Sequence, residues 1–379
     1  MGTNPGAADL SAGRRGGVNL PALRSHNAAL VLDLLRTAGE AGVSRLELAD
    51  RTGLTPQAVS KITARLREEG LVADAGRRAS TGGKPATVLR LVPTAAYAVG
   101  LHLDRDELTA VLLDLAGAPV AVRRAPLDLG AGAEPVLAAA RAEVAALLAA
   151  EPPEPPEGVK GVKGDKGGSP VLGVGVAMPG PLDHRSGRPG RVTGFPEWDG
   201  FPLREELGRR LGLPVALDKD TNAAALGLAR RPGAPGSFAY VHLGTGLGAG
   251  LVLGGAVLRG GRTGAGELGH QTVQLDGPRC DCGGRGCLEV LCLAALARGD
   301  LAEAARVLGT GAANLVRLLD VDRVLLGGRA VLAAPEVFAH GAREVLAGLG
   351  LPAAVETVTG PTAVADGAAQ LVLAPVFGT

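Results

Sequence analysis

Three cysteines stand close together in the glycine-rich segment CDCGGRGC, at Cys280, Cys282 and Cys287. Thiolates at this spacing suit a tetrahedral zinc ion, and the intervening glycines let the backbone turn tightly enough for the sulfurs to converge. The fourth ligand is either His270, ten residues before the first cysteine, or Cys292, five residues after the third. A zinc ion closed by four protein ligands is structural. The alternative is a set of buried free thiols.

The same four cysteines are the only ones in 379 residues, which is not the pattern of a disulfide framework. The chain has no run of eighteen apolar residues that could span a membrane. Residues 1–17 lack the apolar stretch of a signal peptide. We therefore expect a cytoplasmic protein without a membrane partner.

Charge is distributed unevenly along the chain. Residues 1–92 hold 13 Lys and Arg against 8 Asp and Glu, whereas residues 93–379 hold 26 against 30. A basic front on an acidic body is expected if only the front meets a polyanion. A plain solvated surface would carry the same balance, so charge alone does not identify the partner.

The front of the chain reads as a winged helix-turn-helix, assigned to residues 21–92 after a disordered tail over 1–20. Ser44 and Glu47 form a capping box for the second helix, and Thr55 with Pro56 opens the third. A basic, glycine-rich hairpin separates the two strands that follow. The helices are expected over residues 25–38, 44–52 and 55–70, and the strands over 71–73 and 86–91.

The third helix has one apolar face, made by Val59, Ile62 and Leu66. The opposite face is polar near the N-terminal half, which is the part of a recognition helix that enters the major groove. The hairpin could contact the DNA backbone or the minor groove. A helical bundle with a solvated polar face, or a protein-binding winged helix, would look similar. The candidate contacts to double-stranded operator DNA are Gln57, Ser60, Lys61, Arg65, Arg77, Arg78 and Lys84.

Residues 93–379 alternate between predicted strands and helices, which indicates an α/β effector domain. Residues 151–170, EPPEPPEGVKGVKGDKGGSP, form a low-complexity stretch. An apolar strand resumes the alternation at 171, so we interpret the stretch as a flexible loop inside the domain.

The motifs of this second part resemble those of the ROK family (repressors, open reading frames and kinases), and the front resembles the DNA-binding part of its regulators. The likeness covers nearly the whole chain after the tail and implies an actin-like, ribonuclease-H-like fold of two lobes around a sugar cleft. It also selects His270, rather than Cys292, as the fourth zinc ligand. The motifs that carry it are GAGELGH (264–270), CDCGGRGCLE (280–289), VAMPGPLD (176–183), KDTNAAALG (219–227), HLGTGLGAGLVLGG (242–255) and RVLLGG (323–328).

The resemblance implies that Glu267, His270 and Glu289 hold sugar hydroxyls. Carboxylates accept from hydroxyls, and a metal-bound imidazole keeps its second nitrogen to donate. Asp220 matches the general base of the family's kinases. Any one of these carboxylates alone could be an ordinary surface or loop residue. Their occurrence together, in the order of the family's motifs, argues against that interpretation.

The phosphate-binding turn of a family kinase, Asp-x-Gly-Gly-Thr, is replaced here by HLDRDE, residues 102–107. The glycines are absent, and Asp104, Asp106 and Glu107 would repel a triphosphate. Because phosphoryl transfer depends on positioning phosphate, we expect no kinase activity and regard Asp220 as vestigial.

Two sugar contacts also depart from the family pattern, since Lys219 and Gly194 stand where asparagines are expected. Lys219 suggests an anionic effector, such as a sugar phosphate or an acidic sugar. The alternative is that Asp220 or Glu289 pairs with the ammonium. Trp198, the only tryptophan, is expected near the cleft mouth.

The leading hypothesis is a transcription regulator, most simply a repressor, of carbohydrate genes. A sugar or sugar derivative would favour one arrangement of the lobes and so change the separation of paired DNA heads in a homo-dimer or tetramer. The alternatives are a sugar kinase with an accessory DNA head, and a regulator whose effector domain only oligomerises.

Overall fold

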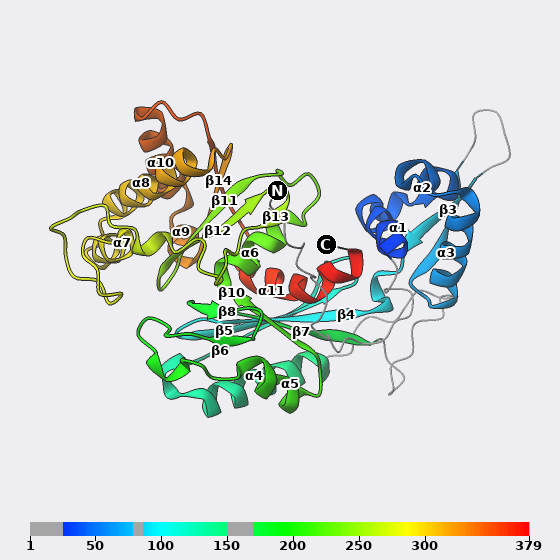
Figure 1. Cartoon of the computed structure of the whole chain (residues 1–379), viewed down its shortest axis with the longest axis horizontal. Coiled ribbons are helices and arrows are strands. Elements are labelled where there is room, and N and C mark those ends of the chain that lie inside the picture. The colour runs from blue at the N-terminus through cyan, green and yellow to red at the C-terminus, as the bar shows by residue number, and fades with distance from the viewer. Residues whose placement is uncertain (1–25, 79–85, 150–169, 379) are drawn as a thin grey trace, which may run out of the picture.

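The computed structural model describes residues 26–78, 86–149 and 170–378. A helical head lies at one end of the molecule, and two lobes, each built on its own sheet, make up the rest (Figure 1). The expected tail over 1–20, nearly all of the loop over 151–170, and Lys84 lie outside the described residues. The proposed domain boundary after residue 92 precedes a short 3-10 helix, Pro93–Ala95.

The head is a winged helix-turn-helix, as the sequence predicts. The expected capping box at Ser44 and Glu47 is present, and the Thr55 hydroxyl accepts a hydrogen bond from the Ala58 N–H. Its three strands form an antiparallel sheet in the order β1-β3-β2. The elements are α1 (His26–Ala38), α2 (Arg45–Thr52), α3 (Pro56–Glu68), β1 (Val43–Ser44), β2 (Val72–Arg78) and β3 (Ala86–Leu91).

The two lobes repeat one sheet topology. In each five-stranded sheet an antiparallel meander of three strands is extended by two strands that run parallel to its first strand. The first sheet has the order β10-β7-β4-β5-β6 and the second the order β13-β12-β11-β14-β15. This duplicated arrangement is the ribonuclease-H-like fold that we expected.

The strands of the first sheet are β4 (Tyr97–Leu103), β5 (Glu107–Asp114), β6 (Pro119–Pro126), β7 (Val171–Met178) and β10 (Val215–Lys219). Those of the second are β11 (Phe238–Leu243), β12 (Leu247–Leu253), β13 (Ala256–Val257), β14 (Arg323–Gly327) and β15 (Ala354–Thr357). A small hairpin, β8 (Leu182–Asp183) and β9 (Arg188–Pro189), follows β7.

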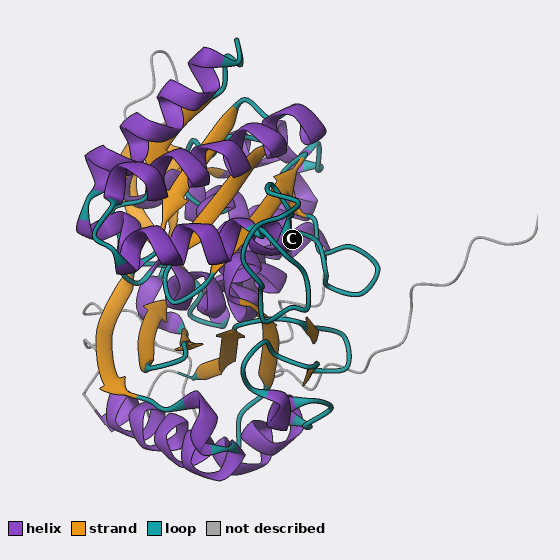
Figure 2. Ribbon diagram, turned by 90° about the vertical axis from the view of Figure 1, so that its left-hand side faces the viewer, coloured by secondary structure: helices purple, strands orange, loops and turns teal. Residues whose placement is uncertain are grey.

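Helices cover both sheets, and two of them lie between the lobes (Figures 1 and 2). The central pair is α6 (Asp220–Ala229) and α11 (Ala363–Leu373), while α4 (Ala133–Ala149) and α5 (Leu203–Leu211) cover the outer face of the first sheet. The second lobe carries α7 (Leu288–Ala297), α8 (Leu301–Leu319), α9 (Arg329–Ala333) and α10 (Pro335–Gly348).

Small residues allow α11 to lie directly on the first sheet. A Cβ on Gly100 of β4 would stand 2.0 Å from the Ala365 carbonyl oxygen, and one on Gly175 of β7 would stand 1.7 Å from that of Ala368. Both glycines are therefore required by close approach of helix and sheet backbones. In the described part of the chain no helix is long and apolar enough to cross a membrane.

Candidate functional site

Four metal-ligating side chains converge at the start of α7. His270 ends a 3-10 helix, Leu268–His270, and Cys287 caps α7, with Cys280 and Cys282 in the loop between. Their ligand atoms all lie within 4.8 Å of one another. The Cys282 and Cys287 sulfurs are 3.7 Å apart, close to the edge of about 3.8 Å that a zinc tetrahedron with Zn–S bonds of about 2.3 Å requires. The donor set fits zinc.

Cys292 is not part of this cluster. It lies one turn further along α7, is fully buried, and directs its sulfur 3.7 Å from the Ala304 carbonyl oxygen. Burial raises the pKa of the Cys292 thiol to about 12. Of the two candidates for fourth ligand, the geometry brings only His270 to the three cysteines.

The candidate effector residues come from three segments of the chain. Lys219 ends β10 and Asp220 begins α6, Glu267 precedes the 3-10 helix that carries His270, and Glu289 lies in the first turn of α7. We call Lys219, Asp220, Glu267 and Glu289 the effector cluster.

Lys219 is paired inside the protein. Its side chain is 2% exposed, and Nζ donates at 2.7 Å both to Glu267 Oε1 and to the Ala265 carbonyl oxygen. Internal pairing was one of the two expected alternatives, but the expected partners were Asp220 or Glu289, and that expectation was wrong. With its charge already balanced by Glu267, Lys219 no longer indicates an anionic effector.

Asp220 is held at the N-terminus of α6, where its Oδ1 accepts from the Thr221 N–H at 2.6 Å. Burial raises the pKa of Asp220 to about 7; it outweighs the lowering effect of the Thr221 N–H, while weaker repulsion from Asp104 and Glu267 adds to it and Lys219 opposes it. The carboxyl group therefore exchanges its proton near neutral pH, as an acceptor of hydroxyl protons would.

Glu289 links α7 to the glycine-rich turn before β12, residues 244–246. Its Oε2 accepts from the Leu247 N–H at 2.8 Å, and the other oxygen has no hydrogen-bond partner in the described part of the chain. A Cβ on Gly246 would stand only 2.9 Å from Oε2, so this loop needs a glycine to approach the carboxylate.

The turn over residues 102–107, HLDRDE, is tied to the other lobe. Arg329, at the start of α9, donates to Asp106 Oδ2 at 2.9 Å and to Asp104 Oδ2 at 3.2 Å, and Thr245 Oγ1 donates to Asp104 Oδ1 at 2.8 Å. We call Asp104, Asp106, Thr245 and Arg329 the clasp. The expectation that each of the three carboxylates would repel a triphosphate thus needs correction, because Arg329 pairs with Asp104 and Asp106.

Other charged residues near the effector cluster were missed by sequence reasoning. Arg259 Nε donates to the buried Asp218 Oδ2 at 2.6 Å, and Asn222 Nδ2 donates to Asp218 Oδ1 at 2.9 Å. A charged residue on a buried strand, such as Asp218, demands a partner, but its spacing from Arg259 in the sequence gives no sign of which one.

Trp198, which we expected near the cleft mouth, has no exposed surface. Its side chain is fully buried in the core of the first lobe, and Nε1 donates to the Leu129 carbonyl oxygen at 3.0 Å. Gly194, nearby, has a φ of +87°, a backbone conformation that asparagine adopts less easily than glycine.

The exposed face of α3 carries the predicted DNA contacts Gln57, Ser60 and Lys61, while Val59 and Leu66 are fully buried. Arg65 is half-buried, and its Nε is sequestered without a partner among the described residues. Arg77 and Arg78 lie on β2, but their side chains, like Lys84, lie outside the described part.

The head is joined to the body by both apolar and polar contacts. One buried cluster runs from Leu32 and Leu35 of α1 to Phe377 at the C-terminus. Asp33 of α1 accepts from Arg230 Nη2 at 2.9 Å, and Arg36 packs over the Phe377 ring. Arg230 caps the C-terminal end of α6, whose first residue is Asp220.

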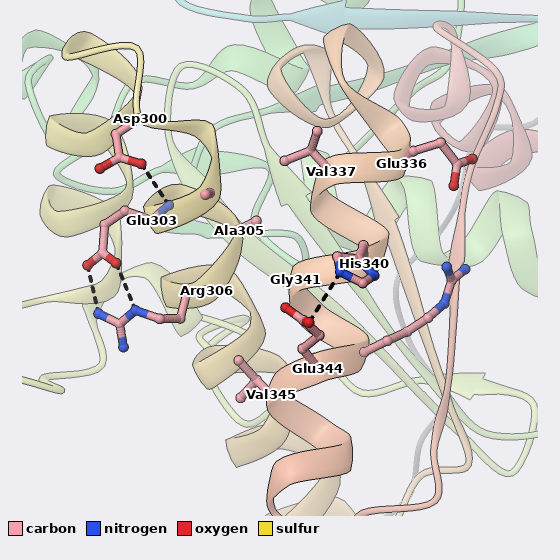
Figure 3. A pocket seen from close by; sticks show the side chains of 12 residues that line it. Asp300, Glu303, Ala305, Arg306, Glu336, Val337, His340, Gly341, Glu344 and Val345 are labelled. Atoms are coloured by element: carbon pink, nitrogen blue, oxygen red, sulfur yellow. Dashed lines mark hydrogen bonds and ion pairs between the residues drawn. The ribbon is translucent and has the colours of Figure 1, made fainter.

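A separate groove of about 970 Å³ lies between α8 and α10 (Figure 3). Its walls carry two ion pairs, Glu303 with Arg306 and His340 with Glu344. It shares no residue with the effector cluster or with the metal-ligating cluster, so we do not include it in the functional site.

Comparison with known families gives two matches. Residues 162–298 match the ROK family, and residues 31–73 match a winged helix-turn-helix DNA-binding family. Among curated proteins, the xylose repressor of Caldicellulosiruptor bescii is 25% identical over 347 residues, which cover 80% of this chain and 83% of the relative. The chain spans 61% of the length of the xylose repressor of Bacillus subtilis.

Solved structures extend this comparison. A ROK family transcriptional regulator described as a homolog of the E. coli MLC protein has a TM-score of 0.73 at 22% identity, covering 93% of this chain and 97% of that one, and so shows a shared fold. The ROK hexokinase of Thermus thermophilus is 31% identical with a TM-score of 0.56, covering 72% of this chain and 96% of the hexokinase. Together with the motifs and the duplicated sheets, these matches show that the chain belongs to the ROK family and carries a winged helix-turn-helix ahead of its ROK domain.

Proposed function

We propose that this protein is a sequence-specific DNA-binding transcription regulator of carbohydrate genes, most simply a repressor, controlled by a sugar or sugar derivative bound at the effector cluster. The observation that carries the proposal is the connection of the two parts through α6. That helix begins at Asp220 in the effector cluster and ends at Ala229, and its C-cap residue, Arg230, pairs with Asp33 of the head. The relatedness to proteins named xylose repressor supports the same function.

The DNA contacts are proposed to come from α3 and the wing, through Gln57, Ser60, Lys61, Arg65, Arg77, Arg78 and Lys84. Gln and Lys on the outer face of α3 can read purine edges, while the basic hairpin neutralises phosphates. One such head reads one half-site, so we propose that a homo-dimer or tetramer presents paired heads to an operator with two half-sites. Selection of bound duplexes from random DNA by the full chain tests this: enrichment of an inverted repeat is expected, and uniform recovery of all sequences would contradict it.

Effector recognition is proposed to use Asp220, Glu267, His270 and Glu289, with Lys219 as a positioning residue. The buried Lys219 ammonium pairs with the exposed Glu267 carboxylate, which fixes the orientation of that carboxylate. Asp220 and the free oxygen of Glu289 supply acceptors for sugar hydroxyls.

We further propose that the protein has no kinase activity. The clasp supports this, because Arg329 and Thr245 engage the turn that wraps nucleotide phosphate in family kinases. Asp104 and Asp106 cannot offer the glycine backbone that phosphate binding requires. Incubation with ATP and hexoses should yield no sugar phosphate. Turnover that Asp220→Asn abolishes would refute this part of the proposal.

The metal-ligating cluster is proposed to hold one structural zinc ion through His270, Cys280, Cys282 and Cys287. Four ligands close the coordination sphere, so the ion would fix the loop rather than take part in chemistry. By orienting His270 and the start of α7, which carries Glu289, it would also position two residues of the proposed effector site.

A further inference from the structure

Arg105 holds a guanidinium without an anionic partner. It lies in the turn between β4 and β5, directly after Asp104, and its side chain is half-buried. The guanidinium carbon lies 5.4 Å from the centre of the Phe195 ring. The guanidinium, which has five N–H donors, forms no hydrogen bond or ion pair within the described residues.

The guanidinium reaches from the first lobe to the edge of the effector cluster. A Cβ on Gly194 would stand 3.6 Å from Nη1, and a Cβ on Gly246 would stand 3.8 Å from Nη2. The same Gly246 position is 2.9 Å from Glu289 Oε2, so Arg105 and Glu289 flank one loop. Neither glycine offers a side chain that could accept from Arg105.

Two other cations near the effector cluster form ion pairs within the described residues. Lys219 is balanced by Glu267, and Arg329 by Asp104 and Asp106. Glu289 is near Arg105 but forms no ion pair with it, and it instead accepts from the Leu247 N–H. Arg105 is therefore a cation beside the effector cluster that has no ion pair within the described residues, so its donors remain available to a ligand.

The planar fork of a guanidinium matches a carboxylate or a phosphate, to which it donates two parallel hydrogen bonds. The Phe195 ring fixes one face of the fork and leaves its edges free. Glu289, an acceptor for neutral hydroxyls, flanks the same Gly246 position as Arg105, so the surroundings combine hydroxyl recognition with one positive charge.

We propose that Arg105 is the anion-recognition residue of the effector site, and that the effector is a sugar bearing a phosphate or carboxylate group. This inference rests on the proposed function and makes it more specific. The anionic group meets Arg105, while the hydroxyls of the sugar ring meet Glu289 and Asp220. The sequence suggested that Lys219 selects anionic effectors. We assign that role to Arg105, in the turn over residues 102–107.

Calorimetric titration of the full chain tests this inference. The probes are glucose, N-acetylglucosamine, their 6-phosphates and glucuronate, at fixed ionic strength. At least one anionic probe should bind wild type tenfold or more tightly than its neutral parent, and the phosphate and carboxylate arms show which group is preferred. Arg105→Gln should remove that advantage without weakening neutral sugars. Arg141→Gln, which removes an exposed arginine from α4, is the matched control and should behave as wild type.

Equal or tighter binding of the neutral parents, an unchanged anion preference in Arg105→Gln, or no binding by any of the probes would overturn the inference. Operator binding of both variants is measured in parallel, because it requires no effector. Retained operator binding with no anion preference overturns only the role of Arg105. If the wild-type protein shows no sequence-specific DNA binding, the proposed function itself is overturned.

Discussion

Arg230 Nη2 lies 2.9 Å from Asp33 Oδ1, so the C-terminal end of α6 is tied to the first helix of the DNA-binding head. The Arg230 side chain is 15% exposed and that of Asp33 is 33% exposed, which shields the pair partly from solvent. Because α6 has ten residues and starts at Asp220, it spans about 15 Å from the effector cluster to the head.

Replacing Arg230 by Gln should weaken the coupling between effector and DNA. Coupling energies of this kind are typically about 1–3 kcal/mol, and we expect Arg230→Gln to lose most of the effector-induced change in operator affinity. Fluorescence anisotropy of labelled operator, with and without effector, measures it. Arg323→Gln breaks an exposed pair with Glu356 far from the head and serves as the control. Equal coupling in both variants would show that α6 does not connect the two sites in this way.

Substitutions on the outer face of α3 should reduce operator affinity without unfolding the head. Gln57→Ala and Lys61→Ala are each expected to cost about 1–3 kcal/mol of binding free energy where the contact is to a base edge. Glu68→Ala, in the last turn of the same helix, is the control, since it removes an exposed acidic side chain. Wild-type affinity of both α3 variants at matched salt would exclude this recognition face.

Elemental measurement on chelator-washed protein should find one zinc per chain. His270→Ala and Cys282→Ser should lose the ion, whereas Cys292→Ser should keep it, because the Cys292 sulfur points into the core. Retention of zinc by His270→Ala together with its loss from Cys292→Ser would reverse the assignment of the fourth ligand.

The stability of the fold should depend on the ionisation of Asp220. Its pKa in the folded protein is raised to about 7, above an unfolded value of about 3.9, so the folded state binds the proton more tightly. The contribution of Asp220 to stability is therefore full below about pH 4 and is lost as pH rises toward 7 and beyond. Asp220→Asn should remove this loss, and denaturant unfolding of both proteins from pH 5 to 8 measures it. Parallel pH profiles would contradict the raised pKa.

Local sequence signals predicted the head well because its helices carry their own caps. Ser44, Glu47, Thr55 and Pro56 specify helix starts by local hydrogen bonding, and the structure has those starts. The metal-ligating cluster was predicted for a similar reason, because Cys280, Cys282 and Cys287 lie close together in the sequence.

The last helices of the chain were not predicted, for a physical reason. α11 is buried on most of its surface between two sheets, so its sequence, AVADGAAQLVL, shows small residues instead of one apolar face. The partners of Lys219, Arg329 and Arg230 were also missed. Each pair joins residues distant in the sequence, and only the packing of the two lobes and the head brings them together.

The central claim is that a ligand at the effector cluster changes the affinity of the head for DNA. The most direct measurement is the dissociation constant of the full chain for its selected operator, at one salt concentration, across the neutral and anionic sugars named above. We predict that at least one of them changes this constant by about fivefold or more, within the usual range of allosteric coupling, and that Asp220→Asn or Glu289→Gln reduces the change. An operator affinity that no sugar alters, in a protein shown by calorimetry to bind one of them, would contradict the account.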